Sequence, residues 1–390
     1  MSLEILTEMS NRYGRNDEYV LAGGGNTSYK ENGILYVKGS GVALSEIIPE
    51  QFVALDIEKL LIMIKPDYHT EMSQAEKEDK ALSDMMDARL SGEENKRPSI
   101  ESVLHAMFPF SFVLHVHPAL INGLTCSKNG KQTCKSIFDD KAVWIDLVKP
   151  GLELAQTCNR EFKANTEKTG KHPQIVILQN HGIFISADTV EEIDGLMEYT
   201  VTKLKENIKE TPSFDDAPYD SSLADAIEAT LKSLYSNDNA ATVLFCTNTQ
   251  VLKYVKDKES FKPVSKSFSP DHIVNCKDEP LFIERQGDGS PVYSLASEAL
   301  KTTEPSPCLD TQFTAYIKRK GFKPKIVAVQ NLGFFALSET KQNAERAKAL
   351  FLDSIKIATY AKSFGGEIPL NDEFAKFILN WEAEAYRSKQ

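Results

Sequence analysis

The sequence predicts an α/β protein built from two related halves. Short apolar runs typical of strands alternate with longer segments of helical periodicity along the first 209 residues. A segment of 16 residues from this first half recurs in the second half. The run Thr211–Pro218, which combines proline, serine and acid, is typical of a linker between them. These observations predict one domain over residues 1–212 and a second over residues 220–390.

The elements of the first half follow from periodicity and from turn residues. Residues 20–37 predict a strand, a glycine-rich turn and a second strand. The stretch 71–90 is polar and acidic with helical propensity, and we expect a solvated face or a flexible excursion there. The other expected helices are 3–13, 57–64, 99–108, 152–162 and 190–209, and the other expected strands are 52–55, 111–117, 174–178 and 183–186.

The internal repeat pairs residues 174–189 (QIVILQNHGIFISADT) with residues 325–340 (KIVAVQNLGFFALSET) at an offset of 151, with seven of 16 positions identical. His181 of the first copy is Leu332 in the second. The second half has no His-x-His and a single histidine, His272. If the halves share ancestry, the second has lost the site described below, and we expect it to serve packing, oligomer contacts or substrate closure.

Composition excludes several classes of protein. The chain has 390 residues, 41% of them hydrophobic, and a net charge of −11, which argues against a nucleic-acid binder because such a protein needs a basic face. Six scattered cysteines without a Cys-x-x-Cys pair indicate reduced thiols. No signal peptide and no apolar run of spanning length is evident, so no membrane partner is expected. We expect a soluble, cytoplasmic protein.

Three histidines predict a metal site. His115 and His117 end a strand-like run, and residues two apart on a strand project to the same side, while Val116 projects to the other side, towards a core. A second strand delivering His181 would complete a set of three neutral nitrogens. Such a set leaves a coordination position open, as a catalytic divalent metal requires, with zinc the first expectation. Each motif alone is more often structural, and the separate histidines 69, 105, 172 and 272 are interpreted as ordinary ones.

Pro98 and Ser99 are typical of a helix start, with Ser99 the expected N-cap. Glu101 would then lie in the first turn, where acids are favoured by the helix dipole. Alternatively, Glu101 is a general base beside the metal. Such a base removes the proton on the carbon next to a metal-bound carbonyl. Residue type alone leaves both interpretations open.

Two glycine-rich segments, residues 23–28 and 38–41, are candidates for binding an anion. Small residues let backbone N–H groups converge on a phosphate, and Asn26, Ser28 and Ser40 can add side-chain donors. Tight hairpin turns without a ligand are the alternative. Neither segment is a Walker A loop or a Gly-x-Gly-x-x-Gly turn, so a nucleotide is not implied.

Taken together, these motifs resemble the class II aldolase/adducin family, and most of all the aldolase part of bifunctional rhamnulose-1-phosphate aldolase/alcohol dehydrogenases. The matching segments run in family order through residues 20–200, and SPDHI (269–273) extends the resemblance more weakly into the second half. No dinucleotide fingerprint follows, so the fused dehydrogenase is not expected. The segments are GGGNTSYK (23–30), YVKGSG (36–41), RPSIESVLHAMFPF (97–110), LHVHP (114–118), VKPG (148–151) and LQNHG (178–182).

The resemblance implies one zinc ion on His115, His117 and His181, with Glu101 as the catalytic base. It implies a substrate phosphate held by Asn26, Ser28, Ser40, Gly41 and Ser99, although Ile100 stands where the family usually has a second serine. It also implies a three-layer αβα sandwich with a mixed, mostly antiparallel sheet, and a homo-oligomer, usually a cyclic tetramer. Family members commonly use a tyrosine as well, often from a neighbouring subunit.

The expected function is therefore zinc-dependent cleavage of a ketose 1-phosphate, such as a rhamnulose 1-phosphate, to dihydroxyacetone phosphate and an aldehyde. A pentulose-phosphate epimerase or a dehydratase of the same superfamily remains open. So do a non-catalytic adducin-like interaction protein and a structural metal site in a binding protein.

Overall fold

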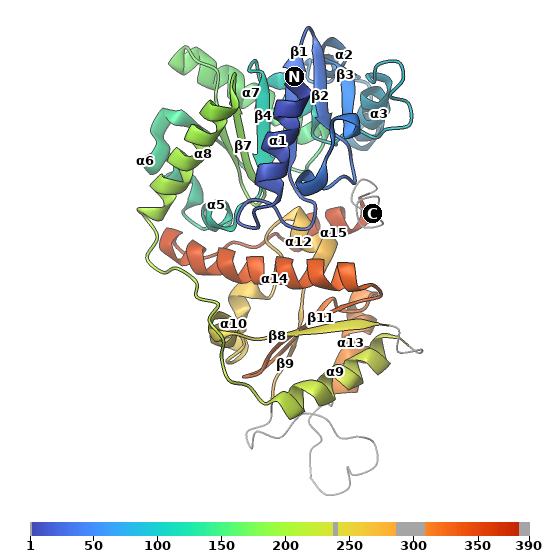
Figure 1. Ribbon diagram of the computed structural model, residues 1–390, viewed down its shortest axis with the longest axis vertical. Helices are drawn as coiled ribbons and strands as arrows, with labels where there is room; N and C mark the ends of the chain where they lie inside the picture. Colours follow the sequence, from blue (N-terminus) through green and yellow to red (C-terminus); the bar gives the residue numbers. More distant parts are fainter. Residues whose placement is uncertain (1, 237–240, 286–308, 382–390) are drawn as a thin grey trace, which may run out of the picture. The chain divides into compact units, whose positions relative to one another are not determined.

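The computed structural model describes residues 2–236, 241–285 and 309–381 (Figure 1). The described residues form two compact units. The first comprises residues 2–209 and 361–366, and the second comprises residues 210–360 and 367–381. Within the described ranges, no helix combines the length and the apolar character that crossing a membrane requires.

Seven strands form the sheet of the first unit, in the order β3-β2-β1-β4-β7-β6-β5. All neighbouring pairs are antiparallel except β5 and β6, which are parallel. The prediction of a mixed, mostly antiparallel sheet is therefore confirmed. The strands are β1 (Asn26–Glu31), β2 (Ile34–Lys38), β3 (Phe52–Asp56), β4 (Phe112–Val116), β5 (Ala142–Ile145), β6 (Ile175–Leu178) and β7 (Gly182–Ala187).

The helices of this unit fall into two groups by their mutual contacts. Helices α2 and α7 each contact both α3 and α4, and α5 contacts α6 and α8. Strands β4, β6 and β7 are buried along their whole length, as strands covered on both faces are. The helices are α1 (Ser2–Gly14), α2 (Ile57–Ile62), α3 (Gln74–Asp87), α4 (Ser102–Met107), α5 (Ala119–Thr125), α6 (Gly130–Phe138), α7 (Leu152–Thr169) and α8 (Val190–Lys205).

The glycine-rich segment does not join two strands, contrary to expectation. It precedes β1, and the β1–β2 hairpin turns at Asn32 and Gly33 instead, both with positive φ (52° and 78°). An Asn-Gly pair suits a two-residue hairpin turn, because both central residues of a type I′ turn need positive φ. Asn26 and Ser28 are consequently residues of strand β1, on one face of the sheet.

The acidic stretch 71–90 is also more ordered than expected, because it forms helix α3. Ser73 and Glu76 make a capping box at its N-terminus. Ala81 and Met85, four residues apart, are buried on one face of the helix. The expectation of a solvated or flexible excursion was therefore wrong for this buried face. Helices α5 and α6 and strand β5 were not predicted.

The second unit holds a four-stranded sheet in the order β8-β11-β10-β9, with β9 and β10 parallel and the other pairs antiparallel. The expectation of a second α/β part is confirmed. The strands are β8 (Thr242–Cys246), β9 (Leu281–Ile283), β10 (Ile326–Val329) and β11 (Gly333–Ser338). The helices are α9 (Ser221–Tyr235), α10 (Thr249–Tyr254), α11 (Lys258–Phe261), α12 (Pro270–Cys276), α13 (Leu309–Lys320), α14 (Lys341–Ala361) and α15 (Asp372–Asn380).

The sequence repeat is also a structural repeat. The order β8-β11-β10-β9 corresponds to β4-β7-β6-β5 of the first unit, with the same parallel and antiparallel pairings. Asn180 and Asn331 occupy the same turn with φ of 54° and 52°. Just before them, the amides of Gln179 and Gln330 donate to the last residue of the neighbouring parallel strand. Counterparts of β1, β2 and β3 are missing among the described residues of the second unit.

The five cysteines within the described ranges are free thiols. Burial raises the pKa of Cys134 to about 12, so that this thiol stays protonated near neutral pH. The sixth cysteine, Cys308, lies outside the described residues.

Candidate metal centre

Three imidazoles from two parts of the sheet converge in the first unit. His115 lies on β4, His117 follows the end of that strand, and His181 lies in the turn between β6 and β7. The Nε2 atom of His115 is 2.9 Å from Nε2 of His117 and 3.3 Å from Nε2 of His181. One nitrogen from each ring lies within 4.8 Å of the others, so the three can share one ion.

Local sequence explains how the turn reaches the strand end. His181 comes from a turn rather than from a strand, unlike the expectation, and its amide donates to Leu178 O at 3.2 Å. Asn180 supplies the positive φ that this turn needs, which asparagine tolerates better than most residues. A Cβ on Gly182 would lie 2.5 Å from Val116 O and 2.6 Å from the His117 ring. Glycine is therefore required where β7 passes the metal-site histidines.

The hydrogen bonding of His115 leaves the correct nitrogen for a metal. Its Nδ1–H donates to Ile183 O at 2.9 Å, so Nε2 carries the lone pair that faces the other two rings. Burial lowers the pKa of His115 well below its usual value, and the neighbouring imidazoles lower it further while Glu101 opposes the shift. A neutral, oriented imidazole is the form that binds a divalent cation. The donor set therefore fits a metal ion such as zinc.

Glu101 lies beside the three rings. Its Oε1 atom is 3.3 Å from His115 Nε2 and 3.4 Å from His181 Nε2, and it has no hydrogen bond within the described residues although it is buried. Its other oxygen, Oε2, accepts a 2.6 Å bond from the Asn26 amide. Burial alone would raise the pKa of Glu101, but the imidazoles and the Asn26 amide outweigh it and lower the pKa to about 2.

The second glycine-rich segment, residues 38–41, and the segment that precedes helix α4 meet next to Glu101. The Ser40 amide donates to Arg97 O at 2.7 Å, and the Ser99 amide donates to Lys38 O at 3.2 Å. This pairing brings Ser40 and the following Gly41 alongside Ser99. The helix begins at Ser102, later than expected, so Glu101 takes the N-cap position. Ser99 Oγ instead accepts a 3.3 Å bond from the Glu101 amide.

Asn26 and Ser28 lie apart from Ser40, Gly41 and Ser99. Strand β1 directs the side chains of Asn26 and Ser28 towards helix α4. Both side chains are buried and bond to His105, with Ser28 Oγ at 2.7 Å from its Nδ1 and Asn26 Oδ1 next to its Nε2. From the sequence, His105 is expected to be an ordinary histidine, and these bonds give it a specific role in the site. Its spacing of four residues from Glu101, which puts both on one helical face, was the signal available.

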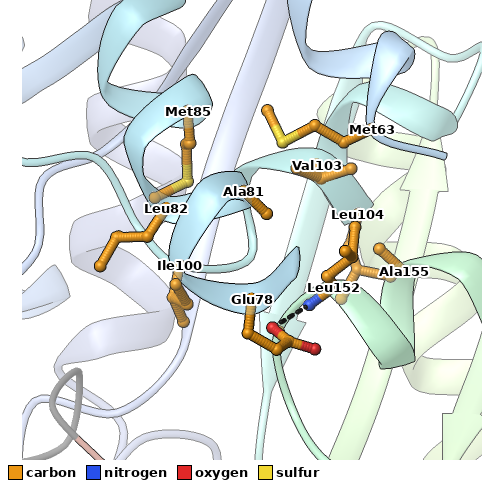
Figure 2. Close-up of a pocket in the computed structure, with 11 residues that line it drawn as sticks. Met63, Glu78, Ala81, Leu82, Met85, Ile100, Val103, Leu104, Leu152 and Ala155 are labelled. Carbon is orange, nitrogen blue, oxygen red and sulfur yellow. Dashed lines mark hydrogen bonds between the residues drawn. The ribbon is translucent and has the colours of Figure 1, made fainter. Parts of the chain in front are cut away.

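The opposite face of α4 borders a small cavity of about 20 Å³ between α3, α4 and α7 (Figure 2). That volume holds about one water molecule and cannot hold a sugar phosphate. The side chain of Glu78 forms part of the cavity wall. Its carboxylate accepts hydrogen bonds from the backbone amides of Leu152 (2.9 Å) and Glu153 (3.0 Å), and Figure 2 shows the bond from Leu152. The cavity is therefore a packing gap beside helix α4, the helix that Glu101 caps, and is not a substrate site. Its lining is Met63, Glu78, Ala81, Leu82, Met85, Ile100, Val103, Leu104, Gly151, Leu152 and Ala155.

The first unit is a mixed α/β domain in which a carboxylate lies beside three histidines that could hold a metal ion, and comparisons with known proteins place the chain further. Residues 6–208 match the family described as the class II aldolase and adducin N-terminal domain. This chain belongs to the class II aldolase and adducin family, and its first unit is the family domain.

Individual relatives are more distant. The chain is 24% identical over 416 residues to an uncharacterized oxidoreductase, YuxG, of Bacillus subtilis, with 99% of this chain and 58% of that protein covered. It therefore spans less than two thirds of that relative. An N-terminal class II aldolase domain from Thermoplasma acidophilum is 24% identical (TM-score 0.44, 53% of this chain and 93% of that one). The L-fuculose-1-phosphate aldolase of Thermus thermophilus is 15% identical (TM-score 0.33, 51% and 92%).

Proposed function

We propose that the first unit is a zinc-dependent aldolase that cleaves a ketose 1-phosphate to dihydroxyacetone phosphate and an aldehyde. The observation that carries the proposal is the buried Glu101 Oε1, which lies within 3.4 Å of two imidazole nitrogens and has no hydrogen bond within the described residues. A carboxylate held there is placed to exchange a proton with a substrate carbon close to the ion. Membership of the class II aldolase and adducin family supports the same chemistry.

The phosphate of the substrate would lie against Ser40, Gly41 and Ser99. The pairing of Ser40 with Arg97 and of Ser99 with Lys38 gathers these small residues next to Glu101. Close backbone approach is what a bound phosphate needs. Anchoring the phosphate there would fix the distance between the reacting carbon of the substrate and the Glu101 carboxylate.

A divalent ion held by His115, His117 and His181 would act as a Lewis acid for the oxygens at the ketone end of the substrate. In cleavage, the hydroxyl that becomes the aldehyde oxygen would lose its proton to solvent, and Glu101, protonated from solvent, would give one proton to the carbon that carries the electron pair after the carbon–carbon bond breaks. In the condensation direction it would remove that proton. The lowered pKa of Glu101 keeps its carboxylate ionised at neutral pH.

The proposal is tested with a panel of ketose 1-phosphates, each assayed for release of dihydroxyacetone phosphate with and without a chelator. A rhamnulose 1-phosphate is the first substrate to try, because the sequence resembles that aldolase most. A pentulose phosphate belongs in the panel as the test of epimerase activity. We expect chelator-sensitive release from at least one hexulose phosphate, and absence of release from every one of them would contradict the proposal.

His181→Leu is the matched variant for the metal. It introduces the residue that occupies the equivalent turn of the second unit, Leu332, where it is buried and tolerated. We expect about one zinc per wild-type chain and its loss in the variant, together with the loss of activity. Equal metal content in the two proteins would remove the three-histidine site from the proposal.

A further inference from the structure

Helix α4 and strand β1 are joined by a row of buried polar groups. Glu101 and His105 lie one helical turn apart and face β1, while Asn26 and Ser28 lie two residues apart on the strand and face α4. Each of the four side chains is less than 10% exposed, and His105 and Ser28 are fully buried. Buried polar groups in contact must match their donors and acceptors, which fixes the position of each proton.

The direction of every bond follows from the carboxylate. Glu101 Oε2 can only accept, so the Asn26 group 2.6 Å away from it is the NH₂ end of the amide. The Asn26 carbonyl oxygen therefore faces His105, whose Nε2 must donate to it. His105 Nδ1 is then the acceptor, and it receives the Ser28 hydroxyl hydrogen over 2.7 Å.

Two further observations agree with a neutral His105 in this single tautomer. The ring is fully buried against Phe184, at a centroid distance of 5.4 Å, in an environment that disfavours a charged imidazole. Burial lowers the pKa of His105 to about 3, with Lys30 adding to the shift and Glu101 opposing it. The imidazole therefore has one donor and one acceptor at any pH near neutrality, and both are used.

We propose that His105 is a positioning residue that, with Ser28, fixes the orientation of the Asn26 amide and through it the Glu101 carboxylate. This inference rests on the proposed function of Glu101. It also changes the role expected for Ser28, because a hydroxyl hydrogen donated to His105 is not available to a substrate phosphate. Ser40, Gly41 and Ser99 remain as the phosphate site.

Two substitutions of His105 separate positioning from packing. His105→Gln keeps one acceptor for Ser28 and one donor for Asn26, whereas His105→Leu fills similar space and offers neither. We expect kcat to fall by about 10- to 100-fold in the leucine variant, as it does when groups that orient a metal site are removed. The glutamine variant should recover most of that loss at equal zinc content. Equal losses in both variants would overturn the proposal.

Ser28 is tested against Ser40 by the division of the effect between kcat and KM. Ser28→Ala should lower kcat and leave KM for the ketose 1-phosphate unchanged, because the serine acts through His105. Ser40→Ala should raise KM, since it removes a phosphate contact. Ser186→Ala removes another buried hydroxyl of the same sheet, bonded to Phe112 O at 3.0 Å, and should change neither constant. A raised KM with unchanged kcat in Ser28→Ala would overturn the proposal.

The tautomer of His105 can be measured without any reaction, so failure of this inference is distinguishable from failure of the proposed function. Long-range proton–nitrogen NMR spectra of histidine-labelled protein, assigned with His105→Gln, report which ring nitrogen carries the hydrogen. We expect hydrogen on Nε2 and none on Nδ1 from pH 6 to 8. Hydrogen on Nδ1, or a protonated ring in that range, would overturn the inference even if the aldolase activity is found.

Discussion

Lys30 is a lysine of the first unit whose positive charge the fold disfavours. It follows Asn26 and Ser28 on the same face of β1, and its Nζ donates to Phe110 O at 2.9 Å. Burial lowers its pKa to about 7, although Asp188 opposes the shift. The Lys30 hydrogen bond therefore links the segment after α4 to strand β1, whose Asn26 bonds Glu101. This bond requires burial of the lysine amine.

This shift predicts how stability depends on pH. Between pH 7 and about 10.5 the folded protein has lost the Lys30 proton while the unfolded chain keeps it, so the free energy of unfolding rises with pH. Relative to Lys30→Met, the wild-type protein should gain up to about 1.4 kcal/mol per pH unit within that window. Urea unfolding followed by Trp144 fluorescence, in a Trp381→Phe background, measures the difference.

Lys171→Met is the control, because Lys171 is exposed in the same unit. Its difference from wild type should not change over the same pH range. A pH-independent difference for Lys30→Met would show that the Lys30 amine is solvated rather than buried.

The convergence of His115, His117 and His181 was predicted from the sequence better than the positions of the residues around them. Alternation along a strand was enough to place His115 and His117 on one side, and the repeat drew attention to His181. The side chains of Asn26 and Ser28 could not be placed, because their direction depends on where β1 begins. Nothing in the local sequence showed that Asn26 would bond His105 rather than line a loop.

Helix α7 illustrates how one element completes another. Its N-cap is Gly151, which has no side chain to accept the first free amides of the helix. Glu78 of α3 provides the acceptor, bonding the amides of Leu152 and Glu153 across the small cavity. Because α4 packs against α7 and borders the same cavity as α3, this bond also supports the helix that Glu101 caps.

Glu78→Ala should therefore destabilise the first unit by about 1–2 kcal/mol, the usual effect of losing a helix cap with its favourable charge. The same Trp144 measurement detects it. Asp79→Ala, on the exposed face of α3, is the control and should change stability by less than about 0.5 kcal/mol. Equal stabilities of the two variants would mean that water caps α7 as well as Glu78 does.

Helices and strands were predicted where the apolar periodicity is strong. Their ends were misplaced where turn and capping residues determine the boundary. The strands 174–178 and 183–186 and the helix from Leu152 were placed closely, because long apolar patterns specify them. Helix α4 begins at Ser102 rather than at Ser99, since a turn precedes it. The Asn32-Gly33 hairpin could have been recognised from the dipeptide alone.

For the whole molecule, the structural repeat shows what the second unit lacks. His115 pairs with Phe184 on β7, and Phe245 pairs with Phe335, the residue 151 positions later. Phe245 therefore stands at the position of His115, Thr247 at that of His117 and Leu332 at that of His181. Counterparts of β1–β3 are also missing from the described residues of the second unit. That unit therefore retains the strands equivalent to β4–β7 without the three histidines.

The family and the mixed sheet were predicted because short motifs in a fixed order carry that information. The order of the strands was not predicted, since pairing of β1 with β4 joins residues far apart in sequence. No local pattern encodes such a contact. That pairing sets Asn26 opposite His115, and it brings the residue that bonds Glu101 next to the three histidines.

The most direct test of the central claim, that Glu101 moves a proton beside the three-histidine site, is exchange between dihydroxyacetone phosphate and heavy water, followed by proton NMR. Wild-type protein with bound zinc should exchange one carbon-bound hydrogen. Glu101→Gln at equal zinc content should be slower by about 10²- to 10⁴-fold, as expected for removal of a general base. Exchange at the wild-type rate in that variant, or none in the zinc-loaded wild-type protein, would contradict the claim.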